Sequence, residues 1–370
     1  MIKLVDVTYY SHLEYQKPEQ VLERHHLVTR YAGLLKDKMH ILFLKHAGFE
    51  GFCVDNGLLY YFFKGVNKFR YLALRANKLI ANQEPDVVLV QGLSFPMEVI
   101  ALRLQCGSRC KIVVQHHGEQ PFTGIKLWLQ RLAAKMTDAY LFTSEGNAEA
   151  WQDKGVIKKR HQIFEVLEAS AQVSAYNKQN SRKKLNIPLG VKTFLWVGRL
   201  NANKDPLCIL KAFGHYLNLQ PSALLYMIYQ TDDLLPDINV LLENDSRLKT
   251  AVILVGKTTH NDLPWWFSAA DYYLSGSHKE GSGYALLEAM ACGCIPVVTA
   301  IPPFRKITAE GKYGYLFKPG DCWDLYRMLC KLEQPQMLTS EAVINHFNES
   351  LSFDRIAEDV YEACRMVVGS

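Results

Sequence analysis

Residues 280–298, EGSGYALLEAMACGCIPVV, contain in succession the signals of a loop, a helix and a buried strand. Gly281 and Gly283 allow the backbone to approach a ligand closely, and the first N–H groups of the helix would bind an anion at the positive end of the helix dipole. Gly293 suits the left-handed conformation that ends a helix, and Pro296 is tolerated near the start of the next strand. The segment therefore predicts an α/β unit with a phosphate-binding helix start.

Two glutamates accompany this predicted anion site. Glu280 lies just before the helix, and Glu288 lies more than one turn inside it. A carboxylate repels a phosphate, so its natural partners in a ligand are hydroxyl groups, which donate hydrogen bonds. The spacing favours a ligand with hydroxyls on both sides of a phosphate, such as a sugar nucleotide with its sugar and its ribose. An ordinary glycine-rich loop is the alternative.

A second cationic segment, LWVGRLNANKDP at residues 195–206, begins inside the expected strand 193–197. Gly198 follows that strand, and Arg199 and Lys204 lie in the loop after it. Ligands of open α/β sheets bind at the carboxyl ends of the strands, so both cations would lie where they can clamp a diphosphate and neutralise a leaving nucleotide. A pair of solvated loop cations is the alternative.

Short runs of Val, Ile, Leu and Phe alternate with amphipathic segments along the chain, which is typical of βα units in a parallel sheet. The expected strands are 3–7, 40–44, 58–62, 86–91, 111–115, 139–143, 162–166, 193–197, 224–228, 251–255, 272–274, 295–298 and 314–317. The polar, basic segment 174–191 indicates a linker with one short helix. We predict an α/β fold of two doubly wound domains, 1–175 and 176–350, and a final amphipathic helix in 351–370 that returns to the first domain.

The first half places histidines at a similar position. His116, His117, Gly118 and Glu119 directly follow the expected strand 111–115, again at a carboxyl end. A histidine there would hydrogen-bond substrate hydroxyls or orient the reacting centre, and adjacent loop side chains point in different directions, so one of the two is expected to do so. Structural histidines are the alternative. A metal site is disfavoured, because no third ligand lies at helical spacing.

Composition and charge exclude several classes of protein. The 370 residues are 49% hydrophobic and 21% charged, which excludes a disordered chain. The nine cysteines form no C-x-x-C pair, and the first residues lack the pattern of a signal peptide, so we expect reduced thiols and a cytoplasmic protein. The most apolar long stretch, 87–104, is interrupted by Gln, Pro and Glu, which argues against a membrane span.

The net charge of +5 arises in the first half of the chain. Such an excess suits an anionic ligand or an anionic membrane surface, with a solvated basic face as the alternative. Residues 62–78 and 124–136 combine Lys and Arg with large apolar side chains, so either could lie on a membrane, but ordinary amphipathic helices packed on the first sheet are the favoured interpretation. Nucleic acid is not expected as a partner, because no dense basic face or module pattern is present.

At these residues the sequence resembles the retaining glycosyltransferases of family four, the group 1 glycosyl transferases. The matching motifs occur in order: VGRL at 197–200 with Lys204, VILVGKTTHNDLPWWFSAADYYLSGS at 252–277, the E-x7-E pair Glu280 and Glu288, and GYLFKPGD at 314–321. The resemblance covers nearly the whole second domain. It implies the GT-B architecture, in which two Rossmann-like domains face each other across a cleft.

The resemblance also implies roles for individual residues. Glu280 would hold the donor sugar, Glu288 the ribose, and Arg199 with Lys204 the diphosphate. His117 would be the active-site histidine, with His116 as second candidate for a sugar or acceptor contact. The implied donor-binding set is Gly198, Arg199, Lys204, Glu280, Gly281, Ser282, Gly283, Tyr284 and Glu288, and the implied catalytic set is Arg199, Lys204, Glu280 and His117.

Two segments depart from the family pattern. Residues 9–20, YYSHLEYQKPEQ, stand where the family often has a glycine pair, and residues 164–170, FEVLEAS, stand where many members have an Asn-Gly turn. Both departures lie in the first domain, which would bind the acceptor. They indicate a subgroup whose acceptor the motifs do not name.

The expected activity is a metal-independent transfer, without a cofactor, of a hexose-type sugar from a UDP or GDP donor to an acceptor hydroxyl with retention. The setting would be polysaccharide or glycoconjugate biosynthesis, with a saccharide or lipid-linked acceptor. The protein would be cytoplasmic, with peripheral contact to the inner face of the membrane as an open addition. The alternatives are a sugar-nucleotide epimerase of the same architecture and a non-catalytic sugar-nucleotide-binding protein. A dehydrogenase is disfavoured, because no G-x-G-x-x-G follows the first strand.

Overall fold

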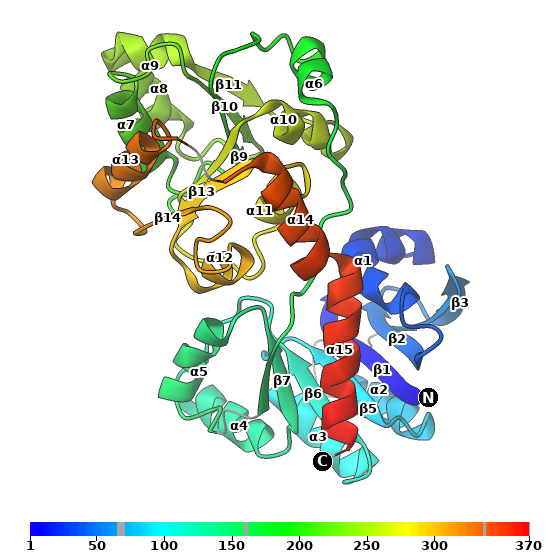
Figure 1. The fold of residues 1–370 in the computed structure, drawn as a ribbon. Helices are drawn as coiled ribbons and strands as arrows, with labels where there is room; N and C mark the ends of the chain where they lie inside the picture. Colours follow the sequence, from blue (N-terminus) through cyan, green and yellow to red (C-terminus); the bar gives the residue numbers. More distant parts are fainter. Residues whose placement is uncertain (65–70, 159–161, 336–337, 370) are drawn as a thin grey trace. The chain divides into compact units, whose positions relative to one another are not determined.

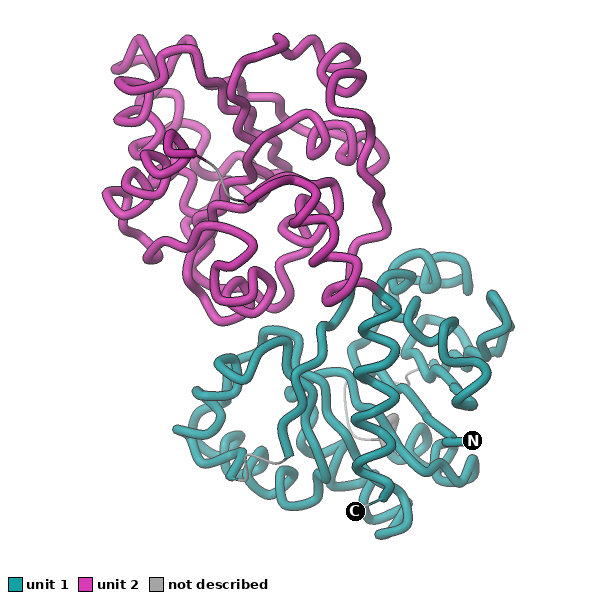
Figure 2. Tube along the Cα trace, in the orientation of Figure 1, with its two compact units in different colours: residues 1–169, 353–370 teal, residues 170–352 magenta. Residues whose placement is uncertain are grey.

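The chain divides into two compact units in a computed structural model, which describes residues 1–64, 71–158, 162–335 and 338–369 (Figures 1 and 2). The first unit comprises residues 1–169 and 353–370, and the second comprises residues 170–352. Each unit is an α/β domain with its own sheet. In the described part of the chain, no helix combines the length and the apolar character needed to cross a membrane.

The described residues of the first unit form an eight-stranded sheet in the order β3-β4-β2-β1-β5-β6-β7-β8. Its strands are β1 (Ile2–His12), β2 (Met39–Ala47), β3 (Gly51–Asp55), β4 (Leu58–Lys64), β5 (Val87–Gln91), β6 (Lys111–Gln115), β7 (Ala139–Phe142) and β8 (Ile163–Glu165). Its helices are α1 (Pro18–Gly33), α2 (Tyr71–Asn82), α3 (Pro96–Cys106), α4 (Gly124–Ala134), the short η1 (Glu145–Ala148), α5 (Glu149–Asp153) and α15 (Phe353–Val368).

The second unit has a six-stranded, wholly parallel sheet in the order β11-β10-β9-β12-β13-β14 among its described residues. Its strands are β9 (Thr193–Gly198), β10 (Leu224–Tyr229), β11 (Val252–Gly256), β12 (Tyr272–Ser275), β13 (Ile295–Thr299) and β14 (Tyr315–Phe317). Its helices are α6 (Lys178–Lys184), α7 (Pro206–Tyr216), α8 (Leu235–Asn244), α9 (Ser246–Ala251), the short η3 (His260–Asp262), α10 (Leu263–Ala269), α11 (Tyr284–Ala291), α12 (Pro302–Ile307), α13 (Cys322–Lys331) and α14 (Ser340–Ser350).

The expected strands are all present, and their burial explains why they could be recognised. Every residue of β5 (VVLVQ) and of β13 (IPVVT) is buried, as expected for central strands of a parallel sheet covered on both faces. Such strands are continuous apolar runs, which are easily distinguished from amphipathic helices. The prediction of an α/β fold with two parallel-sheet domains is therefore confirmed.

Strand β3 was not expected, and it is the one antiparallel member of the sheets in the described chain. It joins β4 through Asn56 and Gly57, which have φ values of 49° and 76°. Two consecutive residues with positive φ make the type I′ turn that Asn-Gly favours in tight hairpins. The dipeptide was a usable signal for this hairpin. The basic stretch 62–78 expected as one amphipathic segment spans the end of β4 and the start of α2, and its residues 65–70 lie outside the described residues.

The final helix α15 belongs to the first unit, where it packs against α1 (Figure 2). The Arg30 guanidinium lies 5.6 Å from the centre of the Phe353 ring, and Lys38 pairs with Glu358 at 2.6 Å. The apolar face of α15 supplies buried side chains such as Ile356 and Val360. The helix thus stabilises the first unit although it is encoded at the far end of the chain.

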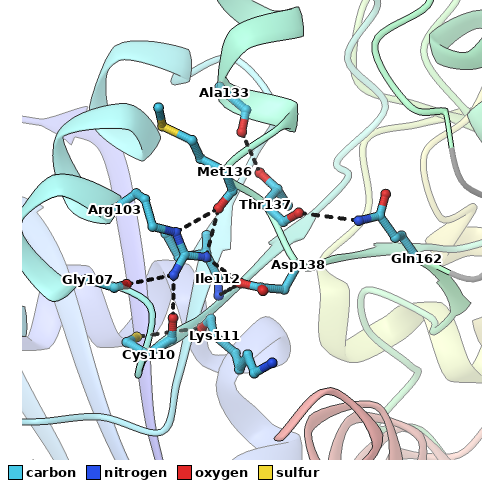
Figure 3. Close-up of polar contacts among 10 residues, drawn as sticks. All are labelled: Arg103, Gly107, Cys110, Lys111, Ile112, Ala133, Met136, Thr137, Asp138 and Gln162. Carbon is cyan, nitrogen blue, oxygen red and sulfur yellow. Dashed lines mark hydrogen bonds and ion pairs between the residues drawn. The ribbon is translucent and has the colours of Figure 1, made fainter. Parts of the chain in front are cut away.

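A polar network around Arg103 secures the amino ends of β6 and β7 (Figure 3). The Arg103 guanidinium donates to the carbonyls of Met136, Gly107 and Cys110 and pairs with the Asp138 carboxylate. The same carboxylate accepts the N–H of Ile112 at 2.7 Å. These bonds fix α3 to the amino ends of β6 and β7. They thereby restrain the strands, whose opposite, carboxyl ends are held in fixed positions.

Candidate active site

The loop between β9 and α7 holds the two predicted cations. Gly198 is the last residue of β9, and Asp205 adopts a left-handed φ of 42° at the end of the loop. The Asp205 carboxylate caps α7 by accepting the N–H of Cys208 at 3.2 Å. The N–H of Lys204 donates to the Asn201 side-chain oxygen at 3.1 Å. The loop is therefore held in shape by its own polar residues.

Asn203 ties this loop to the one that follows β12. Its side-chain NH2 donates to the Lys279 carbonyl at 3.0 Å, its side-chain oxygen accepts the N–H of Lys279 at 3.1 Å, and its carbonyl accepts the N–H of His278 at 2.8 Å. Gly276 permits this approach, because a Cβ there would lie 3.0 Å from the Asp205 carbonyl oxygen. The two loops form one rigid ledge at the carboxyl end of the sheet.

Lys204 and Glu280 meet on this ledge. The Lys204 ammonium forms an ion pair with the Glu280 Oε1, and both side chains are partly buried. Each residue thereby neutralises and orients the other. A ligand that carries a phosphate next to a sugar hydroxyl would contact both members of the pair, because the ammonium binds the anion and the carboxylate accepts from the hydroxyl.

Arg199, the other predicted phosphate-binding cation, does not take part in the ion pair of Lys204 and Glu280. Its side chain is exposed, and within the described residues it has no hydrogen bond or ion pair. Its carbonyl accepts the N–H of Asn201 at 2.8 Å, which fixes the backbone and leaves the guanidinium in solvent. Arg199 therefore offers an unpaired positive charge beside the ledge.

The start of α11 has the geometry expected of an anion site. Gly283 is its N-cap residue, with a φ of 70° and no side-chain cap hydrogen bond. A Cβ at Gly283 would lie 2.6 Å from Cε1 of the Phe304 ring, so only glycine fits. Ser282 is buried before the helix, while Gly281 and Tyr284 are more accessible. The N-terminal end of α11, with its positive dipole, directly follows Glu280 in the chain.

Glu288 lies on α11 with a side chain that is 12% exposed. Burial raises the pKa of its carboxyl from 4.5 to about 7. The exposed His260 approaches Oε1 at 3.6 Å. Burial deprives this carboxyl of hydrogen bonds to water. A neutral ligand group that bears a hydroxyl could replace those hydrogen bonds, so the site suits such a group.

His116, the second candidate for a sugar or acceptor contact, is buried in the first unit. Its ring stacks on Phe142 with centroids 4.7 Å apart, and its Nε2 lies 3.0 Å from the Glu119 carbonyl oxygen. Burial lowers the pKa of His116. These contacts are those of a packed, neutral side chain.

His117 lies at the carboxyl end of the first sheet with both ring nitrogens engaged. Its Nδ1 is 2.5 Å from the Glu168 carboxylate and its Nε2 is 2.7 Å from the Gln91 side-chain oxygen. Sequence reasoning did not single out Gln91, Glu168 or Asn203, although Asn203 lies inside the segment 195–206. Glu168 belongs to the segment FEVLEAS, whose departure from the family pattern was the available signal. In the described chain, no group of three or more His, Cys, Asp or Glu is arranged to hold a metal.

Comparison with known proteins finds similar sequences and folds. Residues 177–341 match the family model described as glycosyl transferases group 1. The chain is 26% identical, over 64% of its length, to a GDP-mannose:cellobiosyl-diphosphopolyprenol alpha-mannosyltransferase of Xanthomonas campestris. It is 27% identical, over 50% of its length, to a UDP-Gal:alpha-D-GlcNAc-diphosphoundecaprenol alpha-1,3-galactosyltransferase of Escherichia coli. The matches span 61% and 50% of the length of these relatives.

Solved structures share the fold over nearly the whole chain. Sucrose-phosphate synthase of Thermosynechococcus elongatus superposes with a TM-score of 0.70 at 16% identity and covers all of both chains. Anabaena HepE, solved in complex with UDP, superposes with a TM-score of 0.71 at 15% identity over 99% of this chain and all of that one.

The fold is therefore that of the GT-B class of glycosyltransferases. The site built on β9, β12 and α11 lies inside the segment that the family model matches. Over residues 177–341 the chain is thus similar to the glycosyl transferases group 1 family.

Proposed function

We propose that this protein transfers a hexose-type sugar from a UDP or GDP donor to an acceptor hydroxyl, with retention of the anomeric configuration and without a metal. The observation that carries the proposal is the Lys204–Glu280 pair, placed beside the uncapped start of α11. An ammonium and a helix N-terminus favour a diphosphate, and the carboxylate adds an acceptor for sugar hydroxyls. A simple phosphate site would have no use for that carboxylate.

In the proposed reaction the bond between the anomeric carbon and the diphosphate oxygen breaks, and the acceptor oxygen bonds to the same face of that carbon. The leaving phosphate oxygen takes the acceptor proton. Lys204 and the unpaired guanidinium of Arg199 would stabilise the charge that develops on the diphosphate, which makes a metal ion unnecessary. Glu280 would hold the sugar, and Glu288 would accept a hydrogen bond from the ribose.

For the acceptor we propose a saccharide linked through a diphosphate to a lipid, as in the names of the two relatives above. The surface of α4 supports contact with a membrane that holds such a lipid. Ile125 and Trp128 are 79% and 59% exposed, and Lys126, Arg131 and Lys135 flank them. Exposed large apolar residues among cations are typical of a helix that lies in an anionic interface.

The first experiment is a thermal-shift panel of UDP, GDP, ADP, TDP and CMP, with and without attached sugars. A ligand at about 100 times its dissociation constant adds about 2.7 kcal/mol of apparent stability, so one base should produce a clear shift. We expect UDP or GDP to do so. A folded protein that responds to none of them would contradict the proposal.

The second experiment follows the product by NMR with the preferred donor and lipid-diphosphate saccharide acceptors. We expect the product to keep the equatorial anomeric proton of an α-linked donor, and we expect EDTA not to change the rate of transfer. An inverted product, or activity abolished by EDTA and restored by a divalent cation, would overturn the corresponding part of the proposal. A changed sugar nucleotide formed without acceptor would identify an epimerase instead.

A further inference from the structure

A row of polar side chains crosses the carboxyl end of the first sheet. Thr8 on β1 is in register with Lys45 on β2 and with Gln91 on β5, so the three side chains point to one face. Asp6 lies two residues before Thr8 on the same face. Asp6 and Lys45 have side chains that are 1% and 3% exposed, which makes this a buried ion pair at the end of an apolar sheet.

The Asp6 carboxylate determines how Gln91 is oriented. Its Oδ1 accepts from the Lys45 ammonium at 2.9 Å, and its Oδ2 lies 2.6 Å from the Gln91 Nε2. An ionised carboxylate only accepts hydrogen bonds, so Gln91 must turn its NH2 group towards Asp6. The amide oxygen of Gln91 is therefore turned the other way, towards His117.

The amide oxygen in turn determines the protonation of His117. His117 Nε2 lies 2.7 Å from that oxygen, and Nδ1 lies 2.5 Å from the Glu168 carboxylate. With Glu168 ionised, both partners only accept, so each ring nitrogen must carry a proton. A neutral His117 would place a nitrogen lone pair against one of the two oxygens. The bonding pattern is satisfied only by the imidazolium.

The other charged groups around His117 are consistent with this state. Glu119 accepts the backbone N–H of His117 at 2.6 Å. Burial lowers the pKa of His117, but Glu168, Glu119 and Asp6 outweigh it, and the pKa is raised overall. Burial lowers the pKa of the adjacent His116 and lowers that of His25, on α1, to about 3. Lys45 is the remaining cation, and Asp6 compensates it directly.

We infer that His117 is a positioning group that is charged at neutral pH, held as an imidazolium by Asp6 through Gln91 on one side and by Glu168 on the other. It does not act as a general base, because neither nitrogen has a lone pair to offer. Its charge compensates part of the negative charge that Asp6, Glu119 and Glu168 bring to this end of the sheet. The protonation state is independent of the proposed transfer, and only its effect on turnover rests on that function.

The test measures protonation directly, by long-range proton–nitrogen NMR of protein labelled with 15N-histidine, with His117 assigned by its absence in His117→Gln. We expect both His117 nitrogens to be protonated at pH 7.5. Gln91→Leu keeps the size of the side chain and removes the oxygen, so the His117 pKa should fall by about one unit. Gln115→Leu is the matched control, because Gln115 is the buried register partner of Gln91 on β6.

A His117 with one unprotonated nitrogen at pH 7.5, or an unchanged titration in Gln91→Leu, would overturn the inference. A second variant isolates the role of Asp6. Asp6→Asn alone leaves Lys45 buried without a counter-ion, so the double variant Asp6→Asn with Lys45→Met is used. It should also lower the His117 pKa. If circular dichroism shows that the double variant is unfolded, Glu168→Gln is measured in its place. Because Glu168 contacts the opposite ring nitrogen, this variant must also lower the His117 pKa.

Turnover gives a separate readout. With a donor and acceptor established, kcat should be flat at low pH and fall as pH rises through the His117 pKa, and the fall should move to lower pH in Gln91→Leu. If Gln91→Leu shifts the His117 titration seen by NMR but not the pH profile of kcat, His117 is charged but its charge does not affect transfer. No transfer at all, with both nitrogens protonated, would contradict the proposed function and leave the imidazolium intact.

Discussion

Replacing Glu288 by glutamine should stabilise the second unit at neutral and alkaline pH while weakening nucleotide binding. Glu288 has a folded-state pKa of about 7, raised from 4.5 by burial. Between these two values the folded protein keeps a proton that the unfolded chain has lost. The free energy of unfolding therefore falls as pH rises through this window. Above the window, the ionised carboxylate destabilises the ligand-free protein.

The magnitude follows from the two pKa values. At about 1.36 kcal/mol per pKa unit, this shift lowers the free energy of unfolding by about 3 kcal/mol in total. About 2.5 kcal/mol of this loss occurs between pH 5 and pH 8. Glutamine has nearly the same shape and does not titrate. The difference in unfolding free energy between Glu288→Gln and the wild type should therefore grow by about 2.5 kcal/mol over this range. For a unit of this size that corresponds to roughly 5–10 °C in Tm.

Differential scanning calorimetry of the whole protein at pH 5 and pH 8 makes the measurement, with the transition of the second unit identified by its response to bound nucleotide. Glu243→Gln is the control, because Glu243 is an exposed glutamate on α8 of the same unit. The same variants are then titrated with the preferred nucleotide. If the stability difference is equal at the two pH values, Glu288 does not carry a raised pKa and the reasoning from its burial fails.

Lys204→Ala removes the ammonium that would stabilise the leaving diphosphate, so kcat at saturating donor should fall at least about a hundredfold, and near-normal turnover would remove Lys204 from the site. Gly283→Ala places a Cβ 2.6 Å from the Phe304 ring at a φ of 70°, whereas Gly190→Ala meets open space at a φ of 77°. Urea denaturation should show the first variant to be less stable by about 1–3 kcal/mol than the second, and equal losses would contradict the clash. Trp128→Ser should weaken co-sedimentation with anionic vesicles several-fold at low salt without changing nucleotide affinity, and unchanged sedimentation would count against membrane contact through α4.

The parts of the fold that were predicted depend on residues close together in the chain. Continuous apolar runs such as β5 and β13 are recognisable because both faces of the sheet are covered. The loop and helix of residues 280–291 were predicted from glycine positions and helix periodicity, and they form as expected. The hairpin at Asn56 and Gly57 was also encoded locally, and the strand β3 before it, GFCVD, was missed because it has only five residues.

The site residues divide in the same way. Glu280 and Glu288 belong to one local motif, so their spacing could be predicted. Lys204 reaches Glu280 from 76 residues away, and that contact exists because β9 and β12 are neighbours in the sheet. Asn203 lies inside the quoted segment 195–206, but its partner Lys279 is 76 residues away, so its role in joining the two loops could be found only in the structure.

The sequence by itself determined the α/β class, the two-domain pattern and the helix that follows the glycine-containing loop 280–283, because these follow from periodicity and turn chemistry within short segments. Only the tertiary structure decided that His117 is charged. Its state depends on Asp6, Gln91 and Glu168, which lie on different elements and meet through the strand order β1-β5-β6-β7-β8. Strand order sets which distant side chains share a buried environment, and in that environment each unpaired donor or acceptor is costly, so the network admits one arrangement of protons.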